Sequence, residues 1–189
     1  MDYVYLVLVL ASLLFYSLLP LFWLARHMLR LRYGKAMSRG VIDATLVVLF
    51  VLLALSMYAI SYDYLPLKND MPPYAAPLGW LLIIGALAIE GWSLYLLNKR
   101  VGSKKSSAAG PVMTGPYAYV RHPIYLAQMA LNFGIYLATG ALIPLLVFAE
   151  WLFLIKPLAD VEDEELALRL EERYLEYKEK VPQLLPKIG

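Results

Sequence analysis

The chain has 189 residues, of which 61% are hydrophobic and 17% are charged, and it contains no cysteine. Soluble globular domains are about 45–50% apolar and about 25% charged, so this composition excludes an ordinary water-soluble domain. It also excludes a disordered chain, which needs low hydrophobicity and a high net charge. The absence of cysteine excludes disulfides, thiolate metal sites and a cysteine nucleophile.

The net charge of +2 is the sum of two unlike parts. Residues 1–156 carry 12 Lys and Arg against 6 acids, whereas residues 157–189 carry 5 against 9. The charge pattern therefore separates a basic, apolar body from a short acidic tail.

The apolar body contains segments long enough to cross a membrane, for which a helix needs about 20 mostly apolar residues. These segments cover residues 3–24, 41–60, 76–97 and 124–155. The last is too long for one span, and Thr139-Gly140 followed by Pro144 predicts a break near its middle. The sequence thus predicts an all-α, polytopic membrane protein with five transmembrane helices, the last two forming a helical hairpin.

The charges of the loops predict how these spans are oriented. All charged residues of the first and third loops are basic, whereas the charged residues of the second loop are one lysine and two aspartates. The basic residues of the two loops are Arg26, Arg30, Arg32, Lys35 and Arg39, then Lys99, Arg100, Lys104, Lys105 and Arg121. Because basic loops stay in the cytoplasm, we expect the N-terminus outside and the C-terminus inside.

Beyond Pro157 the apolar residues recur at spacings of three and four, which is typical of an amphipathic helix. We expect this C-terminal helix to be cytoplasmic and to end at Pro182 and Pro186. Its predicted stripe consists of Leu158, Glu162, Leu166, Leu170, Tyr174, Tyr177 and Val181.

The segment 115–125 (GPYAYVRHPIY) lies where the third loop enters the membrane, and it combines an arginine, a histidine and three tyrosines. Pro123 suits the first turn of the next helix, which places Arg121 and His122 at the N-terminal end of that helix. Such an end attracts a carboxylate, and tyrosine rings attract a cation. The alternative is a plain interfacial belt, since Tyr and Arg are common at membrane boundaries.

The acidic run Asp160–Glu165 is expected to be mostly solvated surface. Glu162 differs from the others because it falls on the apolar stripe of the predicted helix. A carboxylate on the packed face needs a partner. That partner is either a nearby Lys or Arg or a cationic ligand.

Three acids lie in or near the predicted spans: Asp43 near a boundary, Glu90 deep in the third span and Glu150 in the fifth. Ionisable groups in lipid are expensive and therefore suspected of function. For Glu90 the alternative is a hydrogen bond to a neighbouring helix.

Two motifs resemble one known family. The pattern Gly115-x-Tyr117-x-x-x-Arg121-His122-Pro123-x-Tyr125 resembles that of the isoprenylcysteine carboxyl methyltransferases, and residues 174–188 (YLEYKEKVPQLLPKI) resemble the C-terminal ending of that family. The two motifs stand in the same order and at matching spacing, and the resemblance covers about residues 100–188.

The resemblance implies an integral membrane enzyme that uses S-adenosylmethionine to methylate the carboxylate of a prenylated cysteine at the cytoplasmic face. The apolar segments predict a single membrane domain, with three N-terminal spans in residues 1–98, and the resemblance implies that residues 99–189 are its catalytic half. By position it implies a cofactor site lined by Pro111, Val112, Tyr117, His122, Pro123, Tyr125 and Glu162.

The chain departs from the family at two places. The family has an arginine four residues before the glutamate, thought to hold the acceptor carboxylate, where this chain has Leu158. Arg121 or Lys156 is therefore our candidate for positioning that carboxylate. The Phe-Gly pair that precedes the final tyrosines in the family is Leu170-Glu171 here.

Other functions stay open at this point. Within the methyltransferases the alternative acceptor is a phospholipid amine, and outside them the alternatives are a nicotinamide-dependent membrane reductase and a non-catalytic scaffold or transporter. The expected partners are membrane lipids and a lipid-like or prenylated acceptor. We expect no metal, because two histidines 95 residues apart without cysteine are a poor ligand set, and no nucleic acid.

Overall fold

The computed structural model describes residues 69–101 and 110–186, together with the helical residues Tyr3, Val7, Leu10, Leu14, Leu18, Leu21, Phe22, Ala25 and Met28. These residues form helices and no strand. The elements are α2 (Ala75–Val101), the short 3-10 helix η1 (Gly115–Ala118), α3 (Pro123–Thr139), α4 (Leu142–Leu170) and α5 (Glu172–Lys180).

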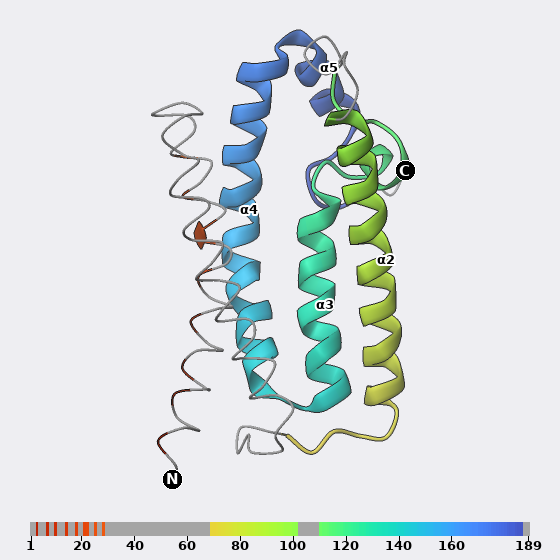
Figure 1. Cartoon of the computed structure of the whole chain (residues 1–189), viewed down its shortest axis with the longest axis vertical. Helices are drawn as coiled ribbons and strands as arrows, with labels where there is room; N and C mark the ends of the chain where they lie inside the picture. The colour runs from red at the N-terminus through yellow and green to blue at the C-terminus, as the bar shows by residue number, and fades with distance from the viewer. Residues whose placement is uncertain are drawn as a thin grey trace.

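The three long helices lie side by side, and α3 and α4 form an antiparallel hairpin (Figure 1). The predicted break is confirmed: α3 ends at Thr139, and Gly140 caps it with a φ of 73°, a left-handed conformation that glycine adopts without strain. The opposite end of the bundle holds the start of α3, the end of α4 and the C-terminal segments. The hairpin therefore brings segments 115–125 and 160–184 together at one end.

Two of the described helices, Ala75–Lys99 and Leu142–Leu170, are long and apolar enough to cross a membrane. The first agrees with the span predicted at 76–97. Of the predicted span 3–24 the structure describes only single helical residues, and the span 41–60 lies outside the described residues.

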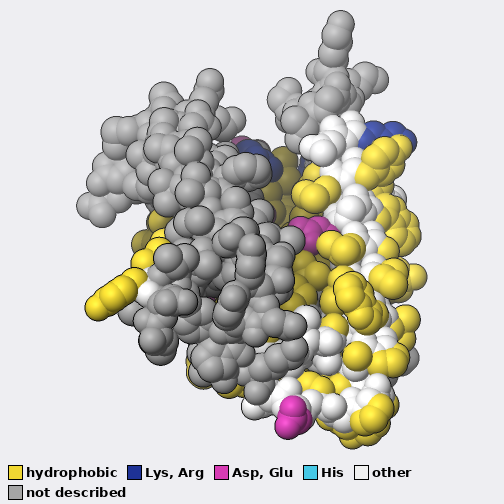
Figure 2. Space-filling model, turned by 60° about the horizontal axis from the view of Figure 1, so that its bottom comes forward, with side chains coloured by type: hydrophobic (Ala, Val, Ile, Leu, Met, Phe, Trp, Pro, Cys, Tyr) yellow, Lys and Arg dark blue, Asp and Glu magenta, His cyan; other side chains and the backbone are white. Residues whose placement is uncertain are grey.

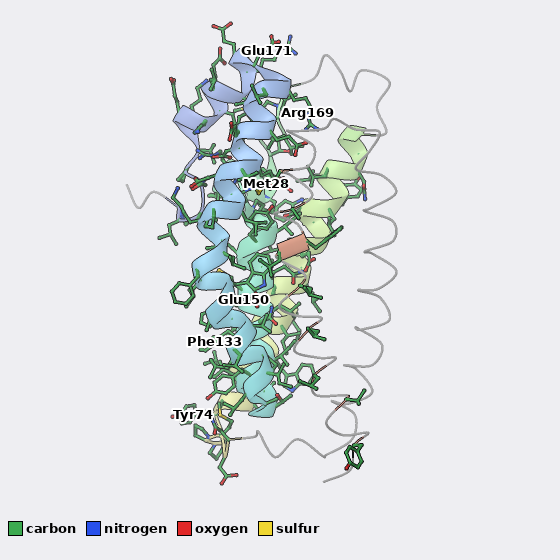
Figure 3. All side chains as sticks on the ribbon, turned by 90° about the vertical axis from the view of Figure 1, so that its left-hand side faces the viewer. Met28, Tyr74, Phe133, Glu150, Arg169 and Glu171 are labelled. Atoms are coloured by element: carbon green, nitrogen blue, oxygen red, sulfur yellow. The ribbon has the colours of Figure 1, made fainter. Side chains whose placement is uncertain are left out.

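The surface of α2 is apolar. Figure 2 shows hydrophobic side chains spread over the described surface, and those of Trp80, Leu81 and Ile84 are more than half exposed. In Figure 3 Glu150 lies between the two ends of the bundle, with Tyr74 near one end and Arg169 and Glu171 at the other. A helix with such a surface needs lipid or further helices around it.

The backbones of α2 and α3 touch at small residues. A Cβ atom on Gly79 would lie 2.6 Å from the carbonyl oxygen of Gly134 and would also collide with the backbone of Ala138. Glycine at such positions lets two membrane helices approach closely. This contact sets the distance between α2 and α3.

The predicted C-terminal helix is wrong in its limits. Helix α4 does not restart at Pro157 but runs through it, so the polar segment 158–170 is the rigid continuation of the apolar segment. A proline removes one hydrogen bond within a helix, and here neighbouring turns maintain the helix around it. The helix ends instead at Leu170, and α5 begins after a corner at Glu171.

The corner folds the predicted stripe back on itself. Tyr174, Tyr177 and Val181 pack against Leu166 and Leu170, so residues expected on one face of a single helix contact one another across the corner. Glu171 adopts φ 51° and ψ −134°, and it is the one non-glycine residue with positive φ in the described chain. Such a conformation costs a side-chain-bearing residue about 1–3 kcal/mol. This conformation occurs at the position where the isoprenylcysteine carboxyl methyltransferases have the glycine of their Phe-Gly pair.

Glu171→Gly should therefore raise the free energy of unfolding by about 0.5–1 kcal/mol, because the relief of strain exceeds the entropy that glycine adds to the unfolded chain. The matched control is Glu172→Gly in the first turn of α5, which should lower it by about 0.5–1 kcal/mol. Thermal unfolding in detergent measures both, and equal losses in the two variants would contradict the assignment of strain to Glu171.

Candidate functional site

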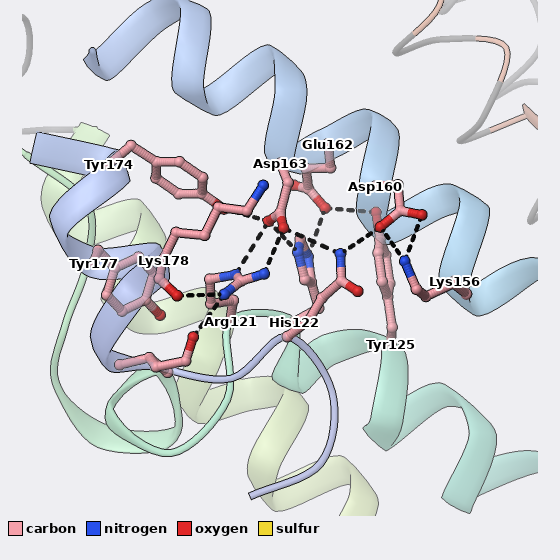
Figure 4. Close-up of polar contacts among 12 residues, drawn as sticks. Arg121, His122, Tyr125, Lys156, Asp160, Glu162, Asp163, Tyr174, Tyr177 and Lys178 are labelled. Carbon is pink, nitrogen blue, oxygen red and sulfur yellow. Dashed lines mark hydrogen bonds and ion pairs between the residues drawn. The ribbon is translucent and has the colours of Figure 1, made fainter. Parts of the chain in front are cut away.

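The site lies where the residues before α3, the end of α4, helix α5 and the C-terminal segment meet (Figure 4). Arg121 and His122 directly precede α3, and Glu162 and Asp163 lie on α4 about two turns before its end. Tyr174 and Tyr177 lie on α5. The sequence motifs 115–125 and 174–188 thus form one cluster with the acidic run.

Asp163 is the centre of this cluster and is only 2% exposed. Its carboxylate accepts hydrogen bonds from Arg121 Nε (3.3 Å) and Nη2 (2.7 Å) and from His122 Nε2 (2.8 Å). It also accepts from the Tyr174 hydroxyl (2.5 Å) and from Gln183 Nε2 (3.1 Å). The expectation that the acidic run is solvated, apart from Glu162, is wrong for Asp163. The sequence does carry a signal for this residue, because Ile155 and Ala159 lie eight and four residues before it and so share its face of the helix.

Arg121 connects Asp163 to the C-terminal segment. Its Nη1 donates to the carbonyls of Lys178 (3.0 Å) and Val181 (2.7 Å). Its backbone N–H donates to the Pro182 carbonyl (2.9 Å), and that of His122 donates to the Gln183 carbonyl (3.2 Å). The guanidinium is thus engaged with groups of the protein itself and holds the C-terminal segment against the start of α3.

Glu162 is held by two aromatic side chains. Its Oε2 accepts a hydrogen bond from the Tyr125 hydroxyl (2.6 Å) and lies 3.2 Å from His122 Nδ1. The rings of His122 and Tyr125 stack with centroids 5.3 Å apart and planes 5° from parallel. The Glu162 side chain is 28% exposed, whereas that of His122 is 3% exposed. Glu162 is therefore fixed in position and still reachable from solvent.

His122 lies between two carboxylates. Burial by itself lowers the pKa of the imidazole, but the hydrogen bonds to Asp163 and Glu162 outweigh burial and raise the pKa above its usual value of 6.5. A protonated imidazole donates from both nitrogens, which matches the two carboxylate contacts. His122 therefore joins Asp163 and Glu162 in one hydrogen-bonded network.

The tyrosines of the cluster stay protonated and act as donors. Burial raises the pKa of Tyr117, Tyr174 and Tyr177. The Tyr177 hydroxyl donates to the carbonyl of Tyr117 (2.7 Å), which fixes η1 against α5. This bond keeps the loop before Arg121 close to the C-terminal helix.

The remaining predicted site residues lie around the cluster. Pro123 is fully buried and begins α3. Pro111 and Val112 are half-buried and follow Gly110, which lies against the side chain of Arg173 on α5. The side chain of Lys156 is exposed, and its Nζ contacts both carboxylate oxygens of Asp160 at 2.6 Å.

Replacing Asp163 by asparagine should destabilise the protein by about 3–5 kcal/mol, because it leaves the buried Arg121 guanidinium without its counter-charge. Asp160→Asn, one turn away on the exposed side of α4, should cost less than about 1 kcal/mol. Thermal unfolding of both variants in detergent checks the difference, and a loss of similar size for the two would contradict the central place of Asp163.

The part of the chain that carries most of this cluster matches a known protein family. No curated protein and no solved structure matches the chain significantly. The family model described as phospholipid methyltransferase matches residues 75–172, slightly more than half of the chain. The match begins at α2 and ends just beyond α4, so it includes Arg121, His122, Glu162 and Asp163. The chain therefore belongs to the phospholipid methyltransferase family of membrane methyltransferases.

Proposed function

We propose that this protein transfers the methyl group of S-adenosylmethionine to an amphiphilic acceptor that reaches the site from the membrane. Membership of a methyltransferase family supports the reaction type and this methyl donor. The observation that carries the proposal is the Glu162 carboxylate, which is oriented by Tyr125 and His122 and remains partly exposed.

The residues of the cluster fit a ligand that carries an ammonium group. A carboxylate fixed by a hydroxyl and an imidazole is a preformed partner for the amino group of the methyl donor. The resemblance to the isoprenylcysteine carboxyl methyltransferases assigns four further residues to the cofactor site. These residues precede or begin α3 at the same end of the bundle: Pro111, Val112, Tyr117 and Pro123. We infer that Glu162 anchors the donor and takes no part in the transfer itself.

The sulfonium group of S-adenosylmethionine supplies an activated methyl group for direct in-line displacement. The protein must hold the two reactants in line and exclude water from the nucleophile. Asp163 and Arg121 serve this task indirectly, because they keep α5 and the C-terminal segment against the start of α3. A carboxylate acceptor is ionised at neutral pH and needs no base, whereas an amine acceptor must first lose a proton.

Two acceptors are candidates. The C-terminal motif favours the carboxylate of a prenylated cysteine, with Arg121 or Lys156 as the residue that positions it. In the structure, however, Arg121 pairs with Asp163 and Lys156 with Asp160. Since both cations already have carboxylate partners, the geometry also supports the second candidate, a phospholipid amine, for which no cation is needed.

We place the site at the cytoplasmic face and the N-terminus outside, which follows from the basic loops before 41 and before 123. The start of α3 and the end of α4 lie at one end of the bundle, as this arrangement requires (Figure 1). A polar donor can then arrive from the aqueous side while the amphiphilic acceptor arrives from the bilayer.

Glu162→Gln should weaken binding of S-adenosylmethionine about 10- to 100-fold, because a hydrogen bond to a charged group is worth about 1.5–3 kcal/mol. The matched control is Glu164→Gln, an exposed acid two residues away, which should leave affinity unchanged. Equilibrium binding of radiolabelled S-adenosylmethionine to the protein in nanodiscs measures both. Binding of a reduced nicotinamide in place of S-adenosylmethionine would overturn the proposal.

The acceptor is identified by the pH dependence of methyl transfer. We expect the rate with a phospholipid amine to rise about tenfold per pH unit below the pKa of the amine, since only the neutral amine is a nucleophile. With a prenylcysteine the rate should be nearly independent of pH above about pH 6, because its carboxylate is already ionised. Labelled transfer to both acceptors, followed by product identification, makes the comparison, and transfer to neither would contradict the proposed acceptor class.

A further inference from the structure

Three polar side chains on the apolar helices α2 and α3 are linked by hydrogen bonds, and we call them the mid-span cluster: Glu90, Gln128 and Asn132. Gln128 Nε2 donates to Glu90 Oε1 at 2.7 Å. Asn132 Nδ2 donates to the backbone carbonyl of Gln128 at 2.8 Å. The Glu90–Gln128 bond agrees with the sequence alternative of a hydrogen bond between neighbouring helices.

That bond leaves one group of the cluster unexplained. Asn132 is only 4% exposed, and its Oδ1 accepts no hydrogen bond from the residues that the structure describes. The partner of its nitrogen is a carbonyl, which can only accept, so the orientation of the amide is fixed and the oxygen points away from that bond. A buried acceptor without a donor is destabilising. Helix packing alone gives no reason to keep an asparagine here.

The cluster continues the functional site into the bundle. Tyr125, which donates to Glu162, is followed at helical spacing by Gln128 and Asn132, one and two turns further along α3. With a rise of 1.5 Å per residue, these two residues lie about 4.5 and 10 Å beyond Tyr125 along the helix axis. This is the depth at which the linkage between the head and the apolar chain of a bound amphiphile would lie.

We propose that the mid-span cluster binds an uncharged hydrogen-bond donor, an O–H or amide N–H, located between the reacting head and the apolar chain of the acceptor. The Asn132 oxygen accepts this bond. The inference rests on the proposed function only in treating this amphiphile as the methyl acceptor. A linkage made only of esters carries acceptor oxygens and does not satisfy the cluster.

The test uses two pairs of amphiphiles that differ by one donor, measured without S-adenosylmethionine on the full chain in phosphatidylcholine nanodiscs. The first pair is lysophosphatidylethanolamine and its 2-O-methyl ether, and the second is N-acetyl-S-farnesylcysteine and its N-methyl derivative. In at least one pair the donor-bearing compound should bind about 3- to 10-fold more tightly, the value of one neutral hydrogen bond. The pair that shows the preference tells whether the donor is a hydroxyl or an amide.

The variant Asn132→Leu should abolish this preference and leave affinity for S-adenosylmethionine unchanged. The added methyl group has the same bulk in wild type and variant, so loss of the preference separates hydrogen bonding from steric exclusion. The matched control is Thr139→Val at the far end of α3, whose hydroxyl already bonds the Ile135 carbonyl and whose loss should keep the preference.

Equal affinities within both pairs in the wild type would overturn the inference without any variant. Persistence of the preference in a folded Asn132→Leu protein would overturn it as well. Failure to bind S-adenosylmethionine would instead remove the proposed function, and the donor preference would still stand or fall on the lipid measurements.

Discussion

The arrangement of the site depends on one buried carboxylate. Asp163 accepts hydrogen bonds from side chains in three segments: Arg121 and His122 before α3, Tyr174 on α5 and Gln183 in the C-terminal segment. A buried charge is tolerated only when it is paired and hydrogen-bonded, so these segments must converge on it. The same requirement explains why the end of the chain lies beside the Arg-His-Pro sequence, about 60 residues away along the chain.

Two adjacent acids therefore have different tasks because their surroundings differ. Asp163 is enclosed and neutralised by Arg121, whereas Glu162 accepts a hydrogen bond from the hydroxyl of Tyr125, contacts the imidazole of His122 and stays partly exposed. His122 contacts both acids, and its raised pKa reflects both. Asp163 thus orients His122, and His122 in turn orients Glu162, the carboxylate proposed to bind the ligand.

Much of the fold and of the site could be predicted from the sequence, and the features that could not have physical causes. The α3–α4 hairpin was predictable because Thr139-Gly140 interrupts a long apolar run, and Glu162 because it interrupts an apolar stripe. Asp163 was not predicted, because the apolar stripe that singled out Glu162 does not include it and a second, adjacent stripe does. The corner at Glu171 was unpredictable, since local preference does not place a glutamate at positive φ, and tertiary packing of the tyrosines imposes it. The partners of the Arg121 guanidinium are 42 to 60 residues away, beyond any local pattern.

The continuity of α4 links the membrane part of the chain to the site. Its apolar residues Val147, Trp151 and Ile155 pack with Tyr125, and the same helix carries Glu162 beyond Pro157. Tyr125 is shared: its ring lies 5.8 Å from that of Trp151, and its hydroxyl donates to Glu162. The packing of the apolar core thus positions the tyrosine that donates to Glu162, the proposed anchor of the methyl donor.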